Sequence, residues 1–256
     1  MQDTNFDTLS QKFAKNIYGT TKGEIRAAVL WRDLEPVINA FSPKSLRILD
    51  AGGGFGFFSQ KLAALGHEVV LCDISAEMLD EAKAQIDAAQ NPLNITLIHS
   101  AIQDLSADEL GKFDIILCHA VAEWLVDAKS TLQGLLNLLK PQGVFSLMFY
   151  NKEAMRFHSL ISGNFDYVKR DMKVKKKVKL TPTYPLFIED VRHWFTLWQM
   201  DIFCQSGVRV LNDYLKYHLP PGFSKQELIE MELEYSQREP YLSLGRYVHF
   251  MAKRNT

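Results

Sequence analysis

The sequence is poor in cysteine and has no long apolar run. Among its 256 residues, only Cys72, Cys118 and Cys204 carry thiols, and each lies in a short apolar segment. This pattern is typical of buried thiols in a reducing compartment and argues against a disulfide framework. No cysteine and histidine residues are spaced as metal ligands, so we expect no metal site. No apolar run approaches the length of a transmembrane helix, so we expect no membrane span.

The net charge is also close to zero, because the chain contains 29 Lys and Arg residues and 30 Asp and Glu residues. Any signal for nucleic acid must therefore be local. Residues 1–4 do not form a basic region followed by an apolar run, so we expect no signal peptide and a cytoplasmic location. The length and the 47% hydrophobic content fit one large α/β domain. No feature of the chain indicates an oligomeric state.

Residues 47–56 are the most informative segment that is present. An apolar run ending at Asp50 leads into Gly52, Gly53, Gly54 and Gly56, and then into a helical pattern. Glycine is needed where the backbone turns sharply or approaches a ligand, and a helix N-terminus offers free N–H groups. The spacing resembles motif I of S-adenosylmethionine (SAM)-dependent methyltransferases more than the dinucleotide pattern G-x-G-x-x-G. We therefore predict that Asp50 and Gly52–Gly54 belong to a cofactor site.

Asp73 supports this interpretation, because it ends a second apolar run about 20 positions beyond the glycines. Rossmann-like folds place an acidic residue there to bind ribose hydroxyls. A carboxylate accepts from both hydroxyls of a vicinal diol at once. The alternative is that Asp73 caps the helix expected at 76–90, although Ser75 is equally able to do so.

Strand-like and helical segments alternate along the whole chain. We expect strands at 47–50, 67–73, 95–99, 113–119, 143–150, 200–204 and 242–253. Helices are expected at 23–39, 76–90, 130–140, 185–198 and 225–237, with a turn at 141–143. This order predicts a Rossmann-like α/β fold of the class I methyltransferase type, with a seven-stranded, mostly parallel sheet whose last strand is antiparallel. Ligands of such sheets lie at the carboxyl ends of the strands, where Asp50, Asp73, Gln103, His119 and Tyr150 fall.

One segment of the nearly neutral chain is strongly basic. Residues 169–179 contain seven cations and one carboxylate. The segment follows the fifth strand and is preceded by aromatic residues such as Phe157 and Phe165. Cations pair with phosphates, and aromatic rings stack on unpaired bases. We therefore predict that the cations contact RNA, the alternative being a solvated loop: Lys169, Arg170, Lys173, Lys175, Lys176, Lys177 and Lys179.

Several segments together resemble one family over nearly the full chain. They are residues 16–23, 49–54, 148–151, 163–168, 207–210, 239–241 and 244–247. The chain is similar to the bacterial tRNA 5-carboxymethoxyuridine methyltransferases. The resemblance implies esterification of the carboxyl group on the wobble uridine at tRNA position 34, with SAM as methyl donor and the anticodon stem-loop as partner. It further implies a single domain over 1–256, with an N-terminal helical cap at about 1–43 and a basic insertion at about 151–184.

The resemblance also implies roles for particular residues. Arg26 would grip the methionine carboxylate of SAM, and Asp73 would hold the ribose. Ile102 and Gln103 would flank the adenine, and His119 would complete the pocket. Without the resemblance, the sequence indicates that Arg26 is a surface arginine of the helix at 23–39. His119 could equally well be a histidine at a strand end whose hydrogen bonds are made within the protein.

A carboxylate acceptor is ionised at neutral pH, so its methylation requires no general base. The protein then needs only to position the donor and the acceptor and to stabilise their charges, so we predict no catalytic acid or base. The candidates for holding the acceptor are Tyr18, Tyr150, Asn151 and Arg209. Arg209 is a bidentate donor suited to a carboxylate, but a salt bridge to Asp213 one helical turn further on is an equal alternative.

Three rival functions remain open from the sequence. A small-molecule carboxyl or O-methyltransferase would use the same cofactor site but would leave the basic segment without a role. A non-catalytic RNA-binding protein on a methyltransferase fold would not bind SAM. A nicotinamide-dependent oxidoreductase is disfavoured by the missing third glycine of G-x-G-x-x-G and by the number of strands.

Overall fold

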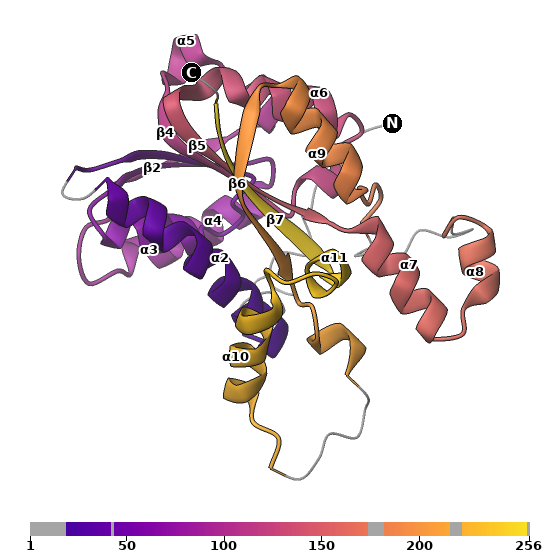
Figure 1. The fold of residues 1–256 in the computed structure, drawn as a ribbon. Helices are drawn as coiled ribbons and strands as arrows, with labels where there is room; N and C mark the ends of the chain where they lie inside the picture. Colours follow the sequence, from indigo (N-terminus) through magenta and orange to yellow (C-terminus); the bar gives the residue numbers. More distant parts are fainter. Residues whose placement is uncertain (1–18, 42–43, 174–181, 216–221, 255–256) are drawn as a thin grey trace.

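The computed structural model describes residues 19–41, 44–173, 182–215 and 222–254. Within these ranges, the strands form one seven-stranded sheet in the order β3-β2-β1-β4-β5-β7-β6 (Figure 1). The strands are β1 Arg47–Ala51, β2 Glu68–Asp73, β3 Ile95–His99, β4 Phe113–His119, β5 Leu139–Tyr150, β6 Met200–Val208 and β7 Tyr247–Arg254. Only β7 runs antiparallel, and it pairs with both β5 and β6. The predicted fold class is thereby confirmed.

Helices cover both faces of the sheet (Figure 1). One face carries α2 Thr21–Ala40, α3 Phe57–Ala64, α4 Ala76–Asp87 and α10 Lys225–Tyr235. The other carries α5 Ala107–Leu110, α6 Ala128–Leu135 and α9 Ile188–Leu197. The helices α7 Lys152–Ile161 and α8 Phe165–Lys169 project beyond the end of β5, and α11 Tyr241–Leu244 precedes β7.

Burial on both faces explains why the central strands read as continuous apolar runs. In β1, Ile48 packs toward the α2 face and Leu49 toward the α6 face, and both are fully buried. Helix α2, which accounts for residues 21–40 of the predicted cap, buries Ile25, Val29 and Leu30 against the sheet. This packing fixes the direction in which the remaining side chains of α2 point.

Several element boundaries differ from the expectation, and the two largest differences concern β7 and α6. The strand expected from residue 242 begins at Tyr247, because Leu242–Leu244 forms a short helix. The helix expected at 130–140 ends at Leu135, is followed by a 3-10 turn (η3 Leu136–Leu138), and leads directly into β5. Residues 141–143, predicted as a turn, form a bulge inside β5. The strand has already begun before them, because Leu139 pairs with Phe113 of β4. A short apolar segment fits either element until its pairing partner is known.

No helix in the described ranges is long and apolar enough to cross a membrane.

Candidate active site

The glycine turn after β1 is held by hydrogen bonds to the neighbouring strand. The amides of Gly52 and Gly53 donate to the carbonyl of Cys72, at 2.8 and 3.2 Å. Gly52 has a φ of 76°, which disfavours any side chain, and a Cβ there would lie 2.5 Å from Cγ2 of Val121. A Cβ on Gly53 would lie 2.5 Å from Cγ of Asp50. The turn therefore requires glycine for steric reasons as well as conformational ones.

Asp50 lies against this turn and is almost completely buried. The hydroxyl of Ser59 on α3 donates to its Oδ2 at 2.7 Å. Burial, together with the charge of nearby Asp73, raises the pKa of Asp50 to about 6. The carboxyl group thus ties the strand to the first turn of α3, and its predicted contact with a cofactor stays a prediction.

Asp73 joins the ends of β1 and β2. Its Oδ2 accepts from the amide of Gly54 at 2.8 Å, and its Oδ1 accepts from the amide of Ser75 at 2.9 Å. The side chain that caps α4 is that of Ser75, which accepts from the amide of Met78. Ser75, and not Asp73, therefore provides the side-chain cap of α4. A carboxylate oxygen that accepts one N–H can accept a second donor, so these bonds are compatible with a ribose hydroxyl.

Arg26 and Glu123 are two buried charged residues with polar atoms that lack hydrogen-bond partners, and they lie close enough to influence each other. Arg26 on α2 is 9% exposed, and its Nε has no hydrogen-bond partner. Glu123, in the 3-10 turn η2 Ala122–Trp124 after β4, is fully buried, and neither of its carboxyl oxygens has one. Burial raises the pKa of Glu123 to about 7, against the lowering effect of the Arg26 charge. Unpaired buried polar atoms are costly, so both groups are candidates for contact with a ligand.

From the sequence, Glu123 and Trp124 follow His119 and could line the methyl site, although a buried Trp after a strand is more often part of the core; Glu123 was not predicted as a cofactor contact. The available signal was a glutamate within an otherwise apolar stretch, 120–126, directly after a strand end.

His119 ends β4 and is partly buried. Its Nε2 lies 2.8 Å from the hydroxyl of Ser146 on β5, and its ring packs edge-on against Phe58. Burial, with contributions from His249 and Arg26, lowers the pKa of His119 well below its ordinary value. The imidazole is therefore neutral at physiological pH.

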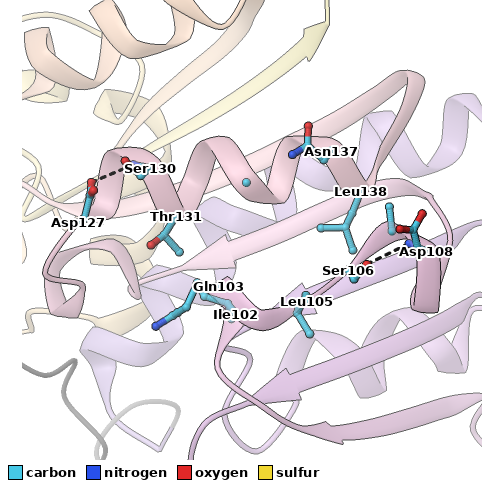
Figure 2. A pocket seen from close by; sticks show the side chains of 12 residues that line it. Ile102, Gln103, Leu105, Ser106, Asp108, Asp127, Ser130, Thr131, Asn137 and Leu138 are labelled. Carbon is cyan, nitrogen blue, oxygen red and sulfur yellow. Dashed lines mark hydrogen bonds between the residues drawn. The ribbon is translucent and has the colours of Figure 1, made fainter.

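Ile102 and Gln103 lie in the 3-10 turn η1 Ile102–Asp104 after β3. They border a groove of about 550 Å³ on the α5–α6 face of the sheet (Figure 2). Figure 2 shows Gln103 and Ser106 on one wall and Thr131 and Asn137 on the other. The lining includes Ile102 and Gln103 of the predicted cofactor site but not the glycine turn, Asp73 or Arg26.

Two of the predicted acceptor-positioning residues, Tyr150 and Arg209, belong to an arginine–tyrosine cluster at the end of β5. The cluster consists of Arg26, Arg209, Arg246, Tyr150, Tyr247 and Asp213. Arg209 binds Asp213 with two hydrogen bonds of 2.6 Å, so the salt bridge that was the alternative interpretation does form. Arg246 reaches the same carboxylate at 3.4 Å. Burial raises the pKa of Asp213, but these arginines outweigh that effect and lower the pKa to about 2.

The other two acceptor candidates differ from this pair. The amide nitrogen of Asn151 donates to the carbonyls of Ser243 and Gly245, and its oxygen accepts from the amide of Glu153. Asn151 is fully buried, and these bonds use its side chain to clamp α7 and α11 to β5. Tyr18 lies outside the described residues.

The basic segment is described only in part. Lys169, the last residue of α8, and Arg170 and Lys173 just after it are exposed. Asp171, the one carboxylate of the segment, pairs with Lys152 at 3.2 Å and Arg156 at 3.7 Å, both on α7. Lys175, Lys176, Lys177 and Lys179 lie outside the described residues. No group of three or more His, Cys, Asp or Glu side chains that could hold a metal ion occurs in the part of the chain that the structure describes.

Comparison with known proteins places the chain in a family. A family model described as "Methyltransferase domain" matches residues 49–145. Over 254 residues, the chain is 45% identical to the tRNA 5-carboxymethoxyuridine methyltransferase of Escherichia coli strain K12, covering 99% of this chain and 97% of that protein. The chain belongs to the tRNA 5-carboxymethoxyuridine methyltransferases. The resemblance inferred from the sequence, and the prediction of a methyltransferase, are thereby confirmed.

More distant relatives of this methyltransferase share the fold. The ubiquinone biosynthesis O-methyltransferase of Xanthomonas axonopodis pv. citri strain 306 is 28% identical over 137 residues, 54% of this chain and 56% of that protein. Magnesium protoporphyrin IX methyltransferase from Synechocystis PCC 6803, solved with bound SAH, superposes with a TM-score of 0.68 at 16% identity. That match covers 98% of this chain and 96% of the other.

Proposed function

We propose that this enzyme transfers the methyl group of SAM to the carboxylate of 5-carboxymethoxyuridine at the wobble position of tRNA, giving the methyl ester. The name of the Escherichia coli relative supports both the tRNA and the modified base. The fold supports SAM, because the Synechocystis neighbour was also solved with SAM bound. The anticodon stem-loop is the tRNA element that contains this base, and the cytoplasm is where we expect the reaction to occur.

The observation that carries the proposal is that Nε of Arg26 and both carboxyl oxygens of Glu123 are buried without hydrogen-bond partners. The methionine end of SAM has a carboxylate and an ammonium group, so it is complementary to one buried guanidinium and one buried carboxylate. Arg26 would bind the carboxylate and Glu123 the ammonium, while Asp73 would bind the ribose. When bound, SAM supplies a methyl group already activated by its sulfonium charge. The ligand thereby satisfies the polar atoms that the protein alone leaves unpaired.

The arginine–tyrosine cluster suits a carboxylate acceptor. Arg209 and Arg246 both face Asp213, so two cations share one anion and the pair retains positive charge. Both arginine side chains are 12% exposed, which strengthens their attraction for a further anion. Burial raises the pKa of Tyr150, so its hydroxyl stays protonated and can donate a hydrogen bond. The acceptor is already ionised, so these groups only need to orient it for in-line attack.

The helices α7 and α8 favour a tRNA over a free metabolite. Phe157 on α7 is 36% exposed and Phe165 on α8 is 56% exposed, and the exposed cations Lys169 and Arg170 lie at the end of α8. Exposed aromatic rings interleaved with cations suit a single-stranded loop, where bases stack on the rings and phosphates pair with the charges. A small-molecule carboxylate would leave these features unused.

The deciding experiment presents the purified enzyme with labelled SAM and three acceptors. These are tRNA that contains 5-carboxymethoxyuridine, the same tRNA with unmodified uridine, and free 5-carboxymethoxyuridine nucleoside. Mass spectrometry of the digested nucleosides should find the methyl ester only on the modified tRNA. Equal methylation of the free nucleoside would favour a small-molecule carboxyl methyltransferase. Binding of SAM with no methyl ester on any acceptor would overturn the proposed substrate.

A further inference from the structure

A buried carboxyl group on α10 holds the loop that follows β6. Oε2 of Glu232 accepts from the amide of Val210 at 2.6 Å, and Oε1 accepts from the amides of Leu211 and Asn212 at 3.1 and 2.7 Å. Glu232 is fully buried. The 3-10 turn η4 Asn212–Tyr214 begins at these amides, and the residue that precedes the turn does not cap it with its side chain. The first amides of a helical turn have no carbonyl partner within it, so Glu232 caps the turn from another helix.

These three hydrogen bonds do not depend on the charge of Glu232. Burial raises the pKa of Glu232, the three amides lower it, and the charge of Asp213 adds a smaller rise. Both oxygens can accept an amide hydrogen in either protonation state, because a carboxylic acid keeps acceptor capacity beside its O–H group. The amide nitrogen of a glutamine carries two hydrogens and accepts none, so a glutamine at this position would set a donor against at least one of the three amides.

The residue directly before these amides, Arg209, has a left-handed backbone. Its φ is 63°, which is uncommon for a residue with a Cβ and costs conformational energy. Its carbonyl accepts from the amide of Arg246 at 3.3 Å, and two residues earlier the amide of Gly207 donates to the carbonyl of Ser236 at 2.7 Å. Such a conformation persists only where the surrounding contacts fix it, and residues of this kind cluster at binding and catalytic sites. Contacts on both sides of Arg209 therefore hold it in a strained conformation.

The side chains of this loop belong to the arginine–tyrosine cluster. Nε and Nη2 of Arg209 each donate to Asp213 at 2.6 Å, and Arg246 reaches the same carboxylate at 3.4 Å. The next residue, Tyr214, donates its hydroxyl to the carbonyl of Leu244 at 2.6 Å. A movement of the backbone at 210–212 would carry Arg209 and Asp213 with it, and a misplacement of about 1 Å at a reacting group lowers rates substantially.

We propose that Glu232 is a positioning residue for the acceptor carboxylate, which it orders through the loop that presents Arg209 and Asp213. Both of its oxygens are bonded to loop amides, so Glu232 acts through the loop and not by touching the acceptor. The inference rests on the proposed function, because that proposal assigns the arginine–tyrosine cluster to the acceptor. The side chains proposed to bind SAM are not among the hydrogen-bond partners of this carboxyl group in the described part of the chain, so donor binding should not depend on Glu232.

Two variants of the full-length protein separate positioning from stability. Glu232→Gln should lower kcat/KM for modified tRNA about 10- to 100-fold and leave the Kd for SAM within about twofold of wild type. Ser236→Ala is the matched control, because Ser236 is equally buried at the end of α10 but its hydroxyl bonds to Arg32 and to the carbonyl of Leu233. It should lower the urea midpoint and keep kcat/KM. Normal kcat/KM in Glu232→Gln would overturn the inference, as would a loss that Ser236→Ala reproduces or that extends equally to SAM binding.

A measurement on the ¹⁵N-labelled wild-type protein decides the matter even where Glu232→Gln does not fold. In the presence of SAH, an anticodon stem-loop with 5-carboxymethoxyuridine should shift the Nε resonance of Arg209 and the amides of residues 210–212. The same stem-loop with unmodified uridine should leave these resonances in place. Equal responses to the two stem-loops would overturn the inference, and the proposed function would stand if modified tRNA is still methylated. A wild-type protein that methylates no tRNA would refute the proposed function, while the NMR comparison would still decide whether the loop binds the carboxylate.

Discussion

The guanidinium of Arg26 lies over the ring of Tyr247, with its carbon 4.7 Å from the ring centroid. The guanidinium of Arg209 lies 5.6 Å from the centroid of the same ring. Tyr247 also packs edge-on against Tyr150, at 5.1 Å. One tyrosine at the start of β7 therefore connects the proposed methionine-binding arginine with the proposed acceptor-binding arginine, which places the donor and acceptor halves of the site next to each other.

Arg26→Gln should weaken SAM binding about 10- to 100-fold, because a charged hydrogen bond to the methionine carboxylate is lost. The free energy of unfolding should change little, since the variant removes a buried group whose Nε has no hydrogen-bond partner but also loses the contact with the ring of Tyr247. Calorimetric titration with SAM and urea denaturation measure the two quantities. Arg156→Gln on α7, whose arginine pairs with Glu153 and Asp171, is the control and should leave SAM affinity unchanged. Loss of stability with unchanged affinity in Arg26→Gln would show that the arginine is structural.

Glu123→Gln should stabilise the protein at alkaline pH and weaken its binding of SAM. Burial raises the pKa of Glu123 to about 7, whereas an exposed glutamate titrates near 4.5. The folded state therefore binds the proton more tightly, and wild-type stability falls as the pH rises from 4.5 to 7. The glutamine variant lacks this loss, so its relative stability should rise by about 3 kcal/mol between pH 4.5 and pH 8. Urea denaturation at several pH values measures the difference, and a difference independent of pH would refute the raised pKa.

Gly53→Ala should abolish SAM binding and destabilise the fold by about 1–3 kcal/mol. The new methyl group would collide with Leu71 and with the carboxyl group of Asp50 beneath the turn. Gly134→Ala is the matched control, because Gly134 lies within α6 and a Cβ there meets no atom within 4 Å. The control should gain up to about 1 kcal/mol from the higher helix propensity of alanine. Thermal unfolding and SAM titration of both variants provide the comparison; a Gly53→Ala protein that binds SAM normally would contradict the predicted close approach.

Arg246→Gln should lower kcat/KM for modified tRNA about 10- to 100-fold and leave the Kd for SAM unchanged, because it removes one of the two cations that share Asp213. Arg209 is less suitable for this test, since its removal would leave Asp213 buried without its bidentate partner. Arg238→Gln, at an exposed ion pair with Glu234, is the control and should change neither parameter. Equal losses in SAM and tRNA binding would place Arg246 outside the acceptor site.

The parts of the site that the sequence predicts well are encoded locally. The strand, the glycine turn and the start of α3 lie within 47–57, and Asp73 follows at a spacing set by one βα unit. The proximity of Arg26 to Glu123 and the bond between Asp33 and His249 bring together residues far apart in the chain, and composition and periodicity contain no signal for such proximity. The start of β7 was misplaced for a related reason, since Leu242–Leu244 is as apolar as a strand and only its packing makes it a helix.

The exposed cations at the end of α8 and just after it provide a test of tRNA binding that is independent of methyl transfer. Replacing Lys169, Arg170 and Lys173 with Gln should weaken binding of the anticodon stem-loop and reduce the slope of log K against log salt by about two, since each phosphate contact contributes about 0.7–0.9 to that slope.

The same number of changes on other exposed lysines, Lys83, Lys112 and Lys129, is the control for net charge. A slope that falls equally in both triple variants would reflect only the overall charge of the protein, whereas a fall confined to the first variant would place the RNA backbone along α8. Because SAM binding involves none of these side chains, its Kd should be the same in both variants, so that any loss of methyl transfer reports the tRNA contact alone.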